Sequence, residues 1–280
     1  LSSSSAASDV YKRQTDYSVF QSEPSWSTTA DFALDKNTGF DGFGVSVAIT
    51  DNWTIVGGGD EKVLIFGNTE GDWDTTAFTL SLNNGYKGND FGGSVAITDN
   101  WAIVGAHIYG EATGVKAFIF KNTDGTWDTS TPVILNQNTG DDDFGHSVAL
   151  TDNWAIVGAA RHGGGANKAF IFKNTAGTWG TTAAFPLDQN TEDTGFGLCV
   201  AITDNWAIVG TKCQKAFIFK NTAGTWGTTA AFNLNQTAGW FGESVAITDN
   251  WAMVGAPFDN KAFIFKNTDG TWDTSTPVIL

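Results

Sequence analysis

The sequence has few cysteines and few basic residues, and each scarcity excludes a class of protein. Only 2 cysteines occur in 280 residues, Cys199 and Cys213, so the chain is not a small scaffold held together by several disulfides. Lysine and arginine number 15 against 30 aspartates and glutamates, and the formal net charge is −15. A nucleic-acid binder needs a basic face that displaces counterions from phosphates. The acidic balance therefore argues against a nucleic-acid partner.

Long apolar runs and proline are also scarce. No run of about 18 apolar residues occurs, so no membrane-spanning segment is expected. The 5 prolines contrast with 33 glycines and 12 tryptophans, a composition typical of many short strands connected by glycine turns. With 41% hydrophobic residues, the chain can bury a sizeable core as one large all-β domain.

The first fourteen residues, LSSSSAASDVYKRQ, match nothing downstream. They lack the apolar core of a signal peptide, and the chain does not begin with methionine. We expect residues 1–14 to be a disordered tail or a sequence scar, and residues 15–280 to form the folded repeats.

One stretch, SVAITDNWAIVGA at residues 94–106, recurs in close copies along the chain. Its tryptophan has equivalents 45 to 53 residues apart, at Trp53, Trp101, Trp154, Trp206 and Trp251. A period of this size is typical of propeller blades and of solenoid units. Because the repeats of a β-solenoid are usually much shorter, the period favours the propeller.

Each unit contains four short segments, which in residues 91–135 are FGGSVAIT, WAIVGA, KAFIFKN and TWDTSTPVIL. The fourth contains Pro132 in this unit and Pro277 in the last, which predicts an outer edge strand because proline cannot donate to a sheet ladder. Four antiparallel strands repeated at this period predict a β-propeller of four-stranded blades.

The first two segments are separated by Asp99-Asn100, two residues that tolerate positive φ, which predicts a tight hairpin. Val95 then faces Val104 on one side of the sheet, while Trp101 and Ile103 lie on the other side. Neither side is polar, so the sheet must be covered on both faces.

Phe-Gly opens the first segment of every unit, at Phe43, Phe91, Phe144, Phe196 and Phe241, and the last copy has Gly-Ala-Pro at 255–257. These features resemble the FG-GAP repeat of the integrin alpha-subunit propeller and of many extracellular proteins. The resemblance covers roughly residues 17–280 and implies an extracellular or cell-surface propeller with an adhesive or ligand-binding role. The turn at residues 122–128 lacks the first acidic ligand of that family's calcium loop. The chain resembles the calcium-free variety, and we expect no metal and no cofactor.

Residues 17–38 align with the third and fourth segments of a further unit, which makes about five and a half blades. Residues 261–280 are identical to residues 116–135, yet the earlier copy runs on into another unit. The two partial ends duplicate each other and cannot complete one shared blade. We therefore expect a fragment of a six- or seven-bladed propeller.

Three tryptophans that follow the glycine turn of their units are candidate ligand residues: Trp127, Trp179 and Trp226. An exposed indole stacks well on a sugar ring because it offers a large contact area at little entropy cost. The interpretation we favour for these side chains is that they bridge the outer strand to the next blade.

The loops offer two further candidates. Arg161 lies in one of the loops of variable length that follow the second segment, and variation on a rigid frame usually carries binding specificity. Asp141, Asp142 and Asp143 form the densest acidic cluster, which is either a cation or partner site or a solvated loop.

The leading interpretation is a non-enzymatic recognition or adhesion propeller, outside the cell or on its surface, that binds a protein or surface ligand. A glycan-binding lectin propeller is the alternative, and an accessory domain of a secreted or surface enzyme is a second alternative. Catalysis by these residues is not expected, because no acid, base and nucleophile stand in a recognisable constellation.

Overall fold

The computed structural model describes Leu34 and residues 42–58, 62–82, 90–107, 116–136, 143–160, 167–187 and 195–280. The chain divides into Leu1–Asp35 and Lys36–Leu280, and all the strands described belong to the second part. The expected tail at residues 1–14 lies outside the described residues, as does the expected half-blade at residues 17–38 except for Leu34.

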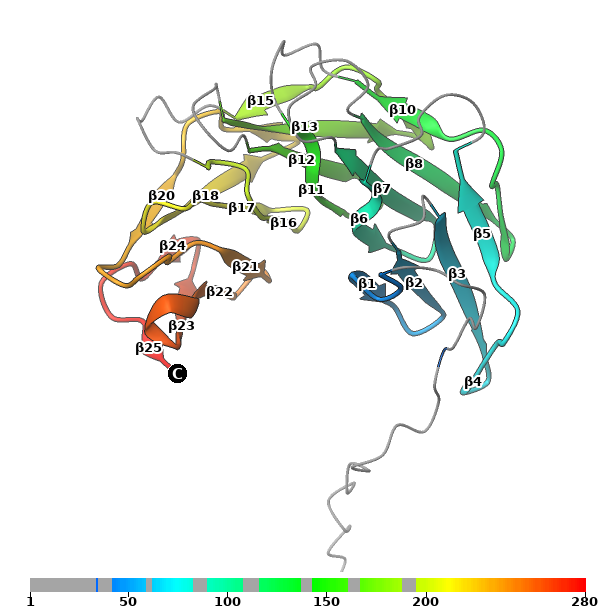
Figure 1. The fold of residues 1–280 in the computed structure, drawn as a ribbon. Helices are drawn as coiled ribbons and strands as arrows, with labels where there is room; N and C mark the ends of the chain where they lie inside the picture. Colours follow the sequence, from blue (N-terminus) through cyan, green and yellow to red (C-terminus); the bar gives the residue numbers. More distant parts are fainter. Residues whose placement is uncertain are drawn as a thin grey trace, which may run out of the picture. The chain divides into compact units, whose positions relative to one another are not determined.

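Five antiparallel sheets follow one another along the chain, each built from one repeat (Figure 1). The first contains β1 (Ser46–Ile49), β2 (Trp53–Gly57), β3 (Lys62–Thr69), β4 (Asp72–Trp73) and β5 (Phe78–Ser81). The second contains β6 (Asp90–Ile97), β7 (Trp101–His107), β8 (Lys116–Thr123), β9 (Thr126–Trp127) and β10 (Val133–Leu135). The third contains β11 (Phe144–Leu150), β12 (Trp154–Ala159), β13 (Lys168–Thr175), β14 (Thr178–Trp179) and β15 (Phe185–Leu187).

The fourth sheet contains β16 (Val200–Ile202), β17 (Trp206–Gly210), β18 (Lys215–Thr222), β19 (Thr225–Trp226) and β20 (Phe232–Asn235). The fifth contains β21 (Ser244–Ile247), β22 (Trp251–Ala256), β23 (Lys261–Thr268), β24 (Thr271–Trp272) and β25 (Val278–Ile279). A short 3₁₀ turn, η1 (Pro257–Asp259), follows β22. In the described part of the chain, no helix is long and apolar enough to cross a membrane.

The fourth strand of each sheet is divided into two pieces. In the second sheet, β9 and β10 both pair with β8. Between them the Asp128 carboxylate accepts hydrogen bonds from the hydroxyl of Thr131 and from the N–H groups of Ser130 and Thr131. These bonds, above all those from the Thr131 hydroxyl and the Ser130 N–H, lower the pKa of Asp128 to about 2. The predicted four-stranded unit is confirmed, with an outer strand that this turn interrupts.

The predicted inner hairpin has the expected register, with Val95 opposite Val104. Its turn is built differently from the expectation, because neither residue of Asp99-Asn100 has positive φ. Instead the Thr98 hydroxyl accepts the N–H groups of Asn100, at 3.2 Å, and Trp101, at 3.1 Å. A threonine side chain therefore closes the turn in place of left-handed backbone.

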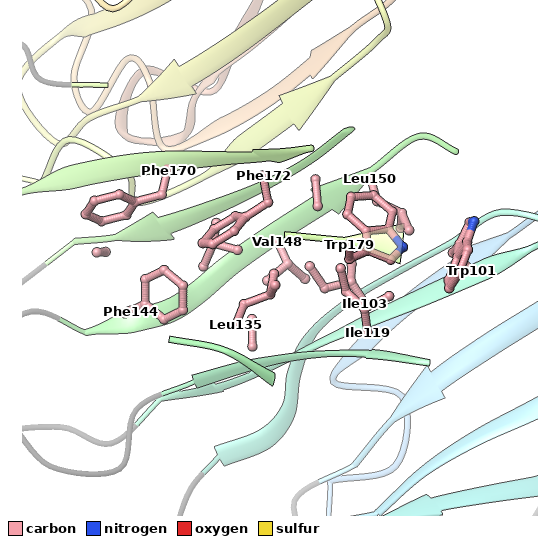
Figure 2. Close-up of a cluster of buried hydrophobic side chains, with 14 residues drawn as sticks. Trp101, Ile103, Ile119, Leu135, Phe144, Val148, Leu150, Phe170, Phe172 and Trp179 are labelled. Atoms are coloured by element: carbon pink, nitrogen blue, oxygen red, sulfur yellow. The ribbon is translucent and has the colours of Figure 1, made fainter. Parts of the chain in front are cut away.

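Each hydrophobic core lies between two consecutive sheets. Val95 and Val104 pack with Ile55 of the first sheet, whereas Trp101 and Ile103 on the other side pack with the third sheet (Figure 2). Both faces of the middle sheets are therefore buried, as their apolar pattern predicts.

The Phe-Gly pair at the start of each unit sets the contact with the preceding sheet. Phe91 packs edge-on against Phe118 of its own sheet. Gly92 has a φ of +99°, and its carbonyl oxygen lies so close to Gly57 that a Cβ there would be 2.0 Å away. The same approach, at 2.1 Å, recurs for three further pairs: Gly105 with Gly145, Gly158 with Gly197 and Gly210 with Gly242. Glycine on both sides allows consecutive sheets to lie this close.

Candidate functional site

At the end of the sheets where the inner hairpins turn, one aspartate per turn binds the preceding turn. Asp152 accepts hydrogen bonds from the Thr98 hydroxyl at 2.6 Å and from the Asn100 side-chain amide at 2.8 Å. The same pair of bonds recurs from Thr50 and Asn52 to Asp99, from Thr151 and Asn153 to Asp204, and from Thr203 and Asn205 to Asp249. We call each pair of bonds an aspartate bridge.

The turns border an open hollow of about 860 Å³ that is lined partly by Asp51, Asp99, Asp152 and Asp204. Three of these carboxylates already accept a bond on each oxygen from threonine and asparagine. Within the described ranges, no group of three or more His, Cys, Asp or Glu residues is arranged to hold a metal ion. Three of the four lining aspartates, Asp99, Asp152 and Asp204, therefore connect consecutive sheets.

At the opposite end, where the first strand of each unit begins and the second ends, two aromatic side chains are exposed together. We call this the loop end. Trp240 and Phe258 are 43% and 64% exposed, with ring centroids 4.3 Å apart. Trp240 comes just before β21, and Phe258 lies in η1. The pair thus joins two loops of the same unit.

Buried neighbours hold Trp240 in place. Ala238 and Phe241 on either side are buried in the core between the fourth and fifth sheets, and the N–H of Phe241 donates to the carbonyl of Ala238 at 3.1 Å. Trp240 has a φ of +57°, a left-handed conformation that is rare for a bulky side chain. A Cβ at Gly239 would be 2.8 Å from Cβ of Phe258, so glycine makes room for the second ring. The indole is exposed on a fixed backbone.

The comparison with solved structures identifies the architecture. Among 444 matching chains is the WD40 β-propeller domain of Doa1. It matches with a TM-score of 0.53 and 13% sequence identity over 84% of this chain and 68% of that domain. The fold is a β-propeller. No family model matches the chain, and no curated protein matches it. At this identity the likeness concerns the fold alone, and propellers serve many functions. The five sheets are hereafter blades one to five.

The tryptophans that follow the glycine turns lie between the blades. Trp127, Trp179 and Trp226 are all buried. Trp179 meets Trp101 edge-on, with ring centroids 5.7 Å apart, and the other two make the same contact with Trp53 and Trp154. An exposed ligand-binding position for these side chains is wrong, because the indole of the preceding blade covers each one. They bridge blades, but to the preceding blade and not to the next one.

The other candidate residues fall largely outside the described part of the chain. Arg161, Asp141 and Asp142 lie outside it, so their proposed roles stay predictions. Asp143 is buried, and its carbonyl accepts the N–H of His146 at 3.1 Å. Its surroundings differ from those of a solvated loop.

The two cysteines, both within described strands and loops, are not joined by a disulfide. The thiol of Cys199 donates to the carbonyl of Gly242 at 3.1 Å, as the hydroxyl of Ser147 does to the carbonyl of Gly197. Burial raises the pKa of Cys199 to about 12. Cys199 therefore replaces serine in a bond between blades.

Trp240 was not among the residues selected from the sequence, although the repeat contains a signal for it. The residue before Phe-Gly is Gly42, Asp90, Asp143 and Gly195 in the first four units, and Trp240 in the fifth. Gly42 and Gly195 also have positive φ, +72° and +90°. A large aromatic residue at a position that elsewhere holds glycine or aspartate marks the site.

Proposed function

We propose that the protein is a non-enzymatic recognition propeller of the FG-GAP type, acting outside the cell or at its surface, which binds a protein partner at the loop end. The exposed pair of Trp240 and Phe258 carries this proposal. Tryptophan is enriched among the few residues that dominate binding energy in protein interfaces. A segment whose backbone is already held in position loses little conformational entropy on binding.

Several features support the FG-GAP assignment. The Phe-Gly pair and the glycine of the second strand recur in every unit. In the described blades, these glycines allow a backbone approach between neighbours that a Cβ would block, so the motif has a structural reason to repeat.

The acidic charge bears on the partner. A net charge of −15 favours partners with basic groups around the contact and increases their rate of association at low salt. The apolar pair would supply affinity, and the surrounding charge would supply steering.

A glycan is the second candidate ligand. The exposed Trp240 indole offers a stacking surface, and Asp259 in η1 is exposed next to Phe258, where a carboxylate could accept sugar hydroxyls. Catalysis is not proposed, because the lowered pKa values of Asp128 and Asp273 are explained by hydrogen bonds within their turns.

Site-specific photo-crosslinking tests the proposal. A photoreactive phenylalanine analogue replaces Phe258 in one variant and Ile134, an exposed residue of β10 in blade two, in a matched control. Both variants are incubated with surface proteins from the source organism and then irradiated. We expect one dominant protein to crosslink at position 258 and not at position 134.

The affinity of that protein is then measured for Trp240→Gly, which removes the indole and copies Gly195 of blade four, where φ is also positive. We expect binding at least about tenfold weaker, with unchanged folding. Equal crosslinking at both positions, or equal affinity of wild type and Trp240→Gly, would reject the proposal. A glycan array probed with the wild type and with Trp240→Gly tests the second candidate ligand. A sugar signal that is lost in Trp240→Gly would support the lectin.

A further inference from the structure

The sequence contains two triplets of the type Asn-x-Ser/Thr, in which x is not proline. They are Asn52-Trp53-Thr54 and Asn235-Gln236-Thr237. In proteins that pass through the secretory pathway, the asparagine of such a triplet accepts an N-linked oligosaccharide when it lies on the surface. The surroundings of the two triplets differ, and this difference separates them as acceptors.

The side chains of the first triplet take part in the packing of blade one. The Asn52 side-chain amide donates to the Asp99 carboxylate at 3.0 Å, as one bond of an aspartate bridge to blade two. Thr54 is only 7% exposed, and its hydroxyl donates to the carbonyl of Ala48 at 3.1 Å. An oligosaccharide on Asn52 would have to lie against the turn of blade two. The folded chain therefore disfavours modification there.

The second triplet lies on the surface, where the outer strand of blade four ends. Asn235 is the last residue of β20, and it is exposed. Leu234 before it is completely buried, so the alternation along the strand directs Asn235 away from the core. Among the described strands, β20 pairs with β18 alone. Its other edge leaves space for a bulky group.

The rest of the triplet is also accessible. Gln236 and Thr237 follow the strand, and Thr237 is exposed. Asn235 lies opposite Lys215, the first residue of β18, which places the triplet at the loop end. Within the described residues, the Asn235 side chain makes no hydrogen bond that modification would break.

Blade two contains a close copy of this segment without the hydroxyl residue. Leu135 is completely buried, as Leu234 is, and an exposed Asn136 follows it. The triplet there reads Asn-Gln-Asn at 136–138, against Asn-Gln-Thr at 235–237. The two segments differ as acceptors at their third position, so the chain contains its own control.

We infer that Asn235 is an acceptor site for an N-linked oligosaccharide. The donor is an oligosaccharide joined through pyrophosphate to a lipid, which the secretory pathway supplies. The amide nitrogen of Asn235 forms a bond to C1 of the first sugar and loses a proton. The bond from C1 to the phosphate oxygen breaks, and the lipid pyrophosphate leaves with the electron pair. The inference rests on the proposed function in one respect, because the chain must enter the secretory pathway.

Expression of the full chain behind a signal peptide in cultured animal cells tests the site. The secreted protein is treated with an amidase that releases N-linked oligosaccharides in water labelled with oxygen-18. Each modified asparagine becomes a labelled aspartate, which peptide mass spectrometry locates. We expect one oligosaccharide per chain, with the label at position 235 and none at position 52.

Variants of the third position provide matched controls. Thr237→Ala should lose the oligosaccharide, whereas Thr237→Ser should keep it, and both should be secreted because the side chain is exposed. Asn138→Thr creates the same triplet in blade two and should add a second oligosaccharide, at Asn136. The response to the hydroxyl separates N-linked modification from any other change in mass.

Three results would overturn the inference. They are a secreted chain without an oligosaccharide at Asn235, modification of Asn52 instead of Asn235, and modification of Asn235 that persists in Thr237→Ala. The location of the natural protein is tested separately, by fractionating cells of the source organism. A natural chain found unmodified inside the cell would reject the proposed function, while a label at Asn235 in the cultured cells would still support the acceptor site.

Discussion

At the scale of single residues, Gly158 shows how the absence of a side chain sets the distance between two blades. A Cβ there would lie 2.1 Å from the Gly197 carbonyl oxygen and 2.3 Å from the Ser147 hydroxyl oxygen. A Cβ on Gly255 would meet only the hydroxyl of Ser244, at 2.2 Å, which can rotate away. The two glycines therefore form a matched pair for comparison. The backbone of the next described blade lies beside Gly158, whereas only atoms of Ser244 lie beside Gly255.

We expect Gly158→Ala to lower the free energy of unfolding by about 3 kcal/mol or more, because backbone atoms must move. Gly255→Ala should cost less than about 1 kcal/mol. Urea denaturation of both variants measures the difference. Equal costs would mean that the approach to Gly197 does not determine blade spacing.

The Cys199 thiol gives a second residue-scale prediction. Since burial raises its pKa to about 12, only about one thiol in 10⁴ is ionised at pH 8, and the thiolate is the reactive form. In a Cys213→Ser background, we expect native protein to resist iodoacetamide at pH 8 and urea-unfolded protein to react readily. Similar rates in both states would contradict the hydrogen bond of the Cys199 thiol to Gly242.

At the scale of elements, the aspartate bridges connect hairpins of consecutive blades. Asp152 accepts two bonds from blade two, whereas no such pair from the described residues reaches the carboxylate of Asp51 in blade one. We expect Asp152→Ala to lower the free energy of unfolding by about 2 kcal/mol and Asp51→Ala by less than about 0.5 kcal/mol. Chemical denaturation of the two variants measures both free energies of unfolding. Equal losses would mean that the aspartate acts within its own turn and not between blades.

The divided outer strand gives a pH-dependent prediction. Asp128 has a pKa of about 2 against a usual 3.8, so its hydrogen bonds add stability above pH 3.8, and this is lost as the pH falls toward 2. Because the carboxylate is largely exposed, the contribution is below about 1 kcal/mol. We expect the difference in melting temperature between wild type and Asp128→Asn to shrink from pH 5 to pH 2. A difference in melting temperature that stays constant from pH 5 to pH 2 would show that ionisation of Asp128 does not cause it.

At the scale of the whole molecule, the blades form a series in which each contacts its neighbours, as in other repeat proteins. Blade four is covered on both faces, whereas Trp251 and Met253 of blade five are 47% and 41% exposed. We expect amides of β17 to exchange more slowly than those of β22 by at least about tenfold. Native-state hydrogen exchange with mass spectrometry measures this, and uniform exchange would indicate that the blades unfold together.

Much of the blade could be predicted because its determinants are local. The pairing of Val95 with Val104 follows from alternation and a short turn, and the apolar pattern on both sides follows from the same few residues. The site was harder to predict. Trp127 lies beside a turn in the sequence, and only the preceding blade shows that it is buried. Trp240 differs from its equivalents, but its exposure depends on the anchors beside it.

The sequence by itself determined the number of repeats described, the strands within each one and the apolar character of both faces, since hydrophobic period and turn chemistry act over a few residues. Tertiary structure decided which face meets which blade and where aromatic side chains reach solvent. The aspartate bridge shows the reason: Thr98 and Asp152 are 54 residues apart. Nothing local to either residue specifies a contact that exists only after two blades have packed.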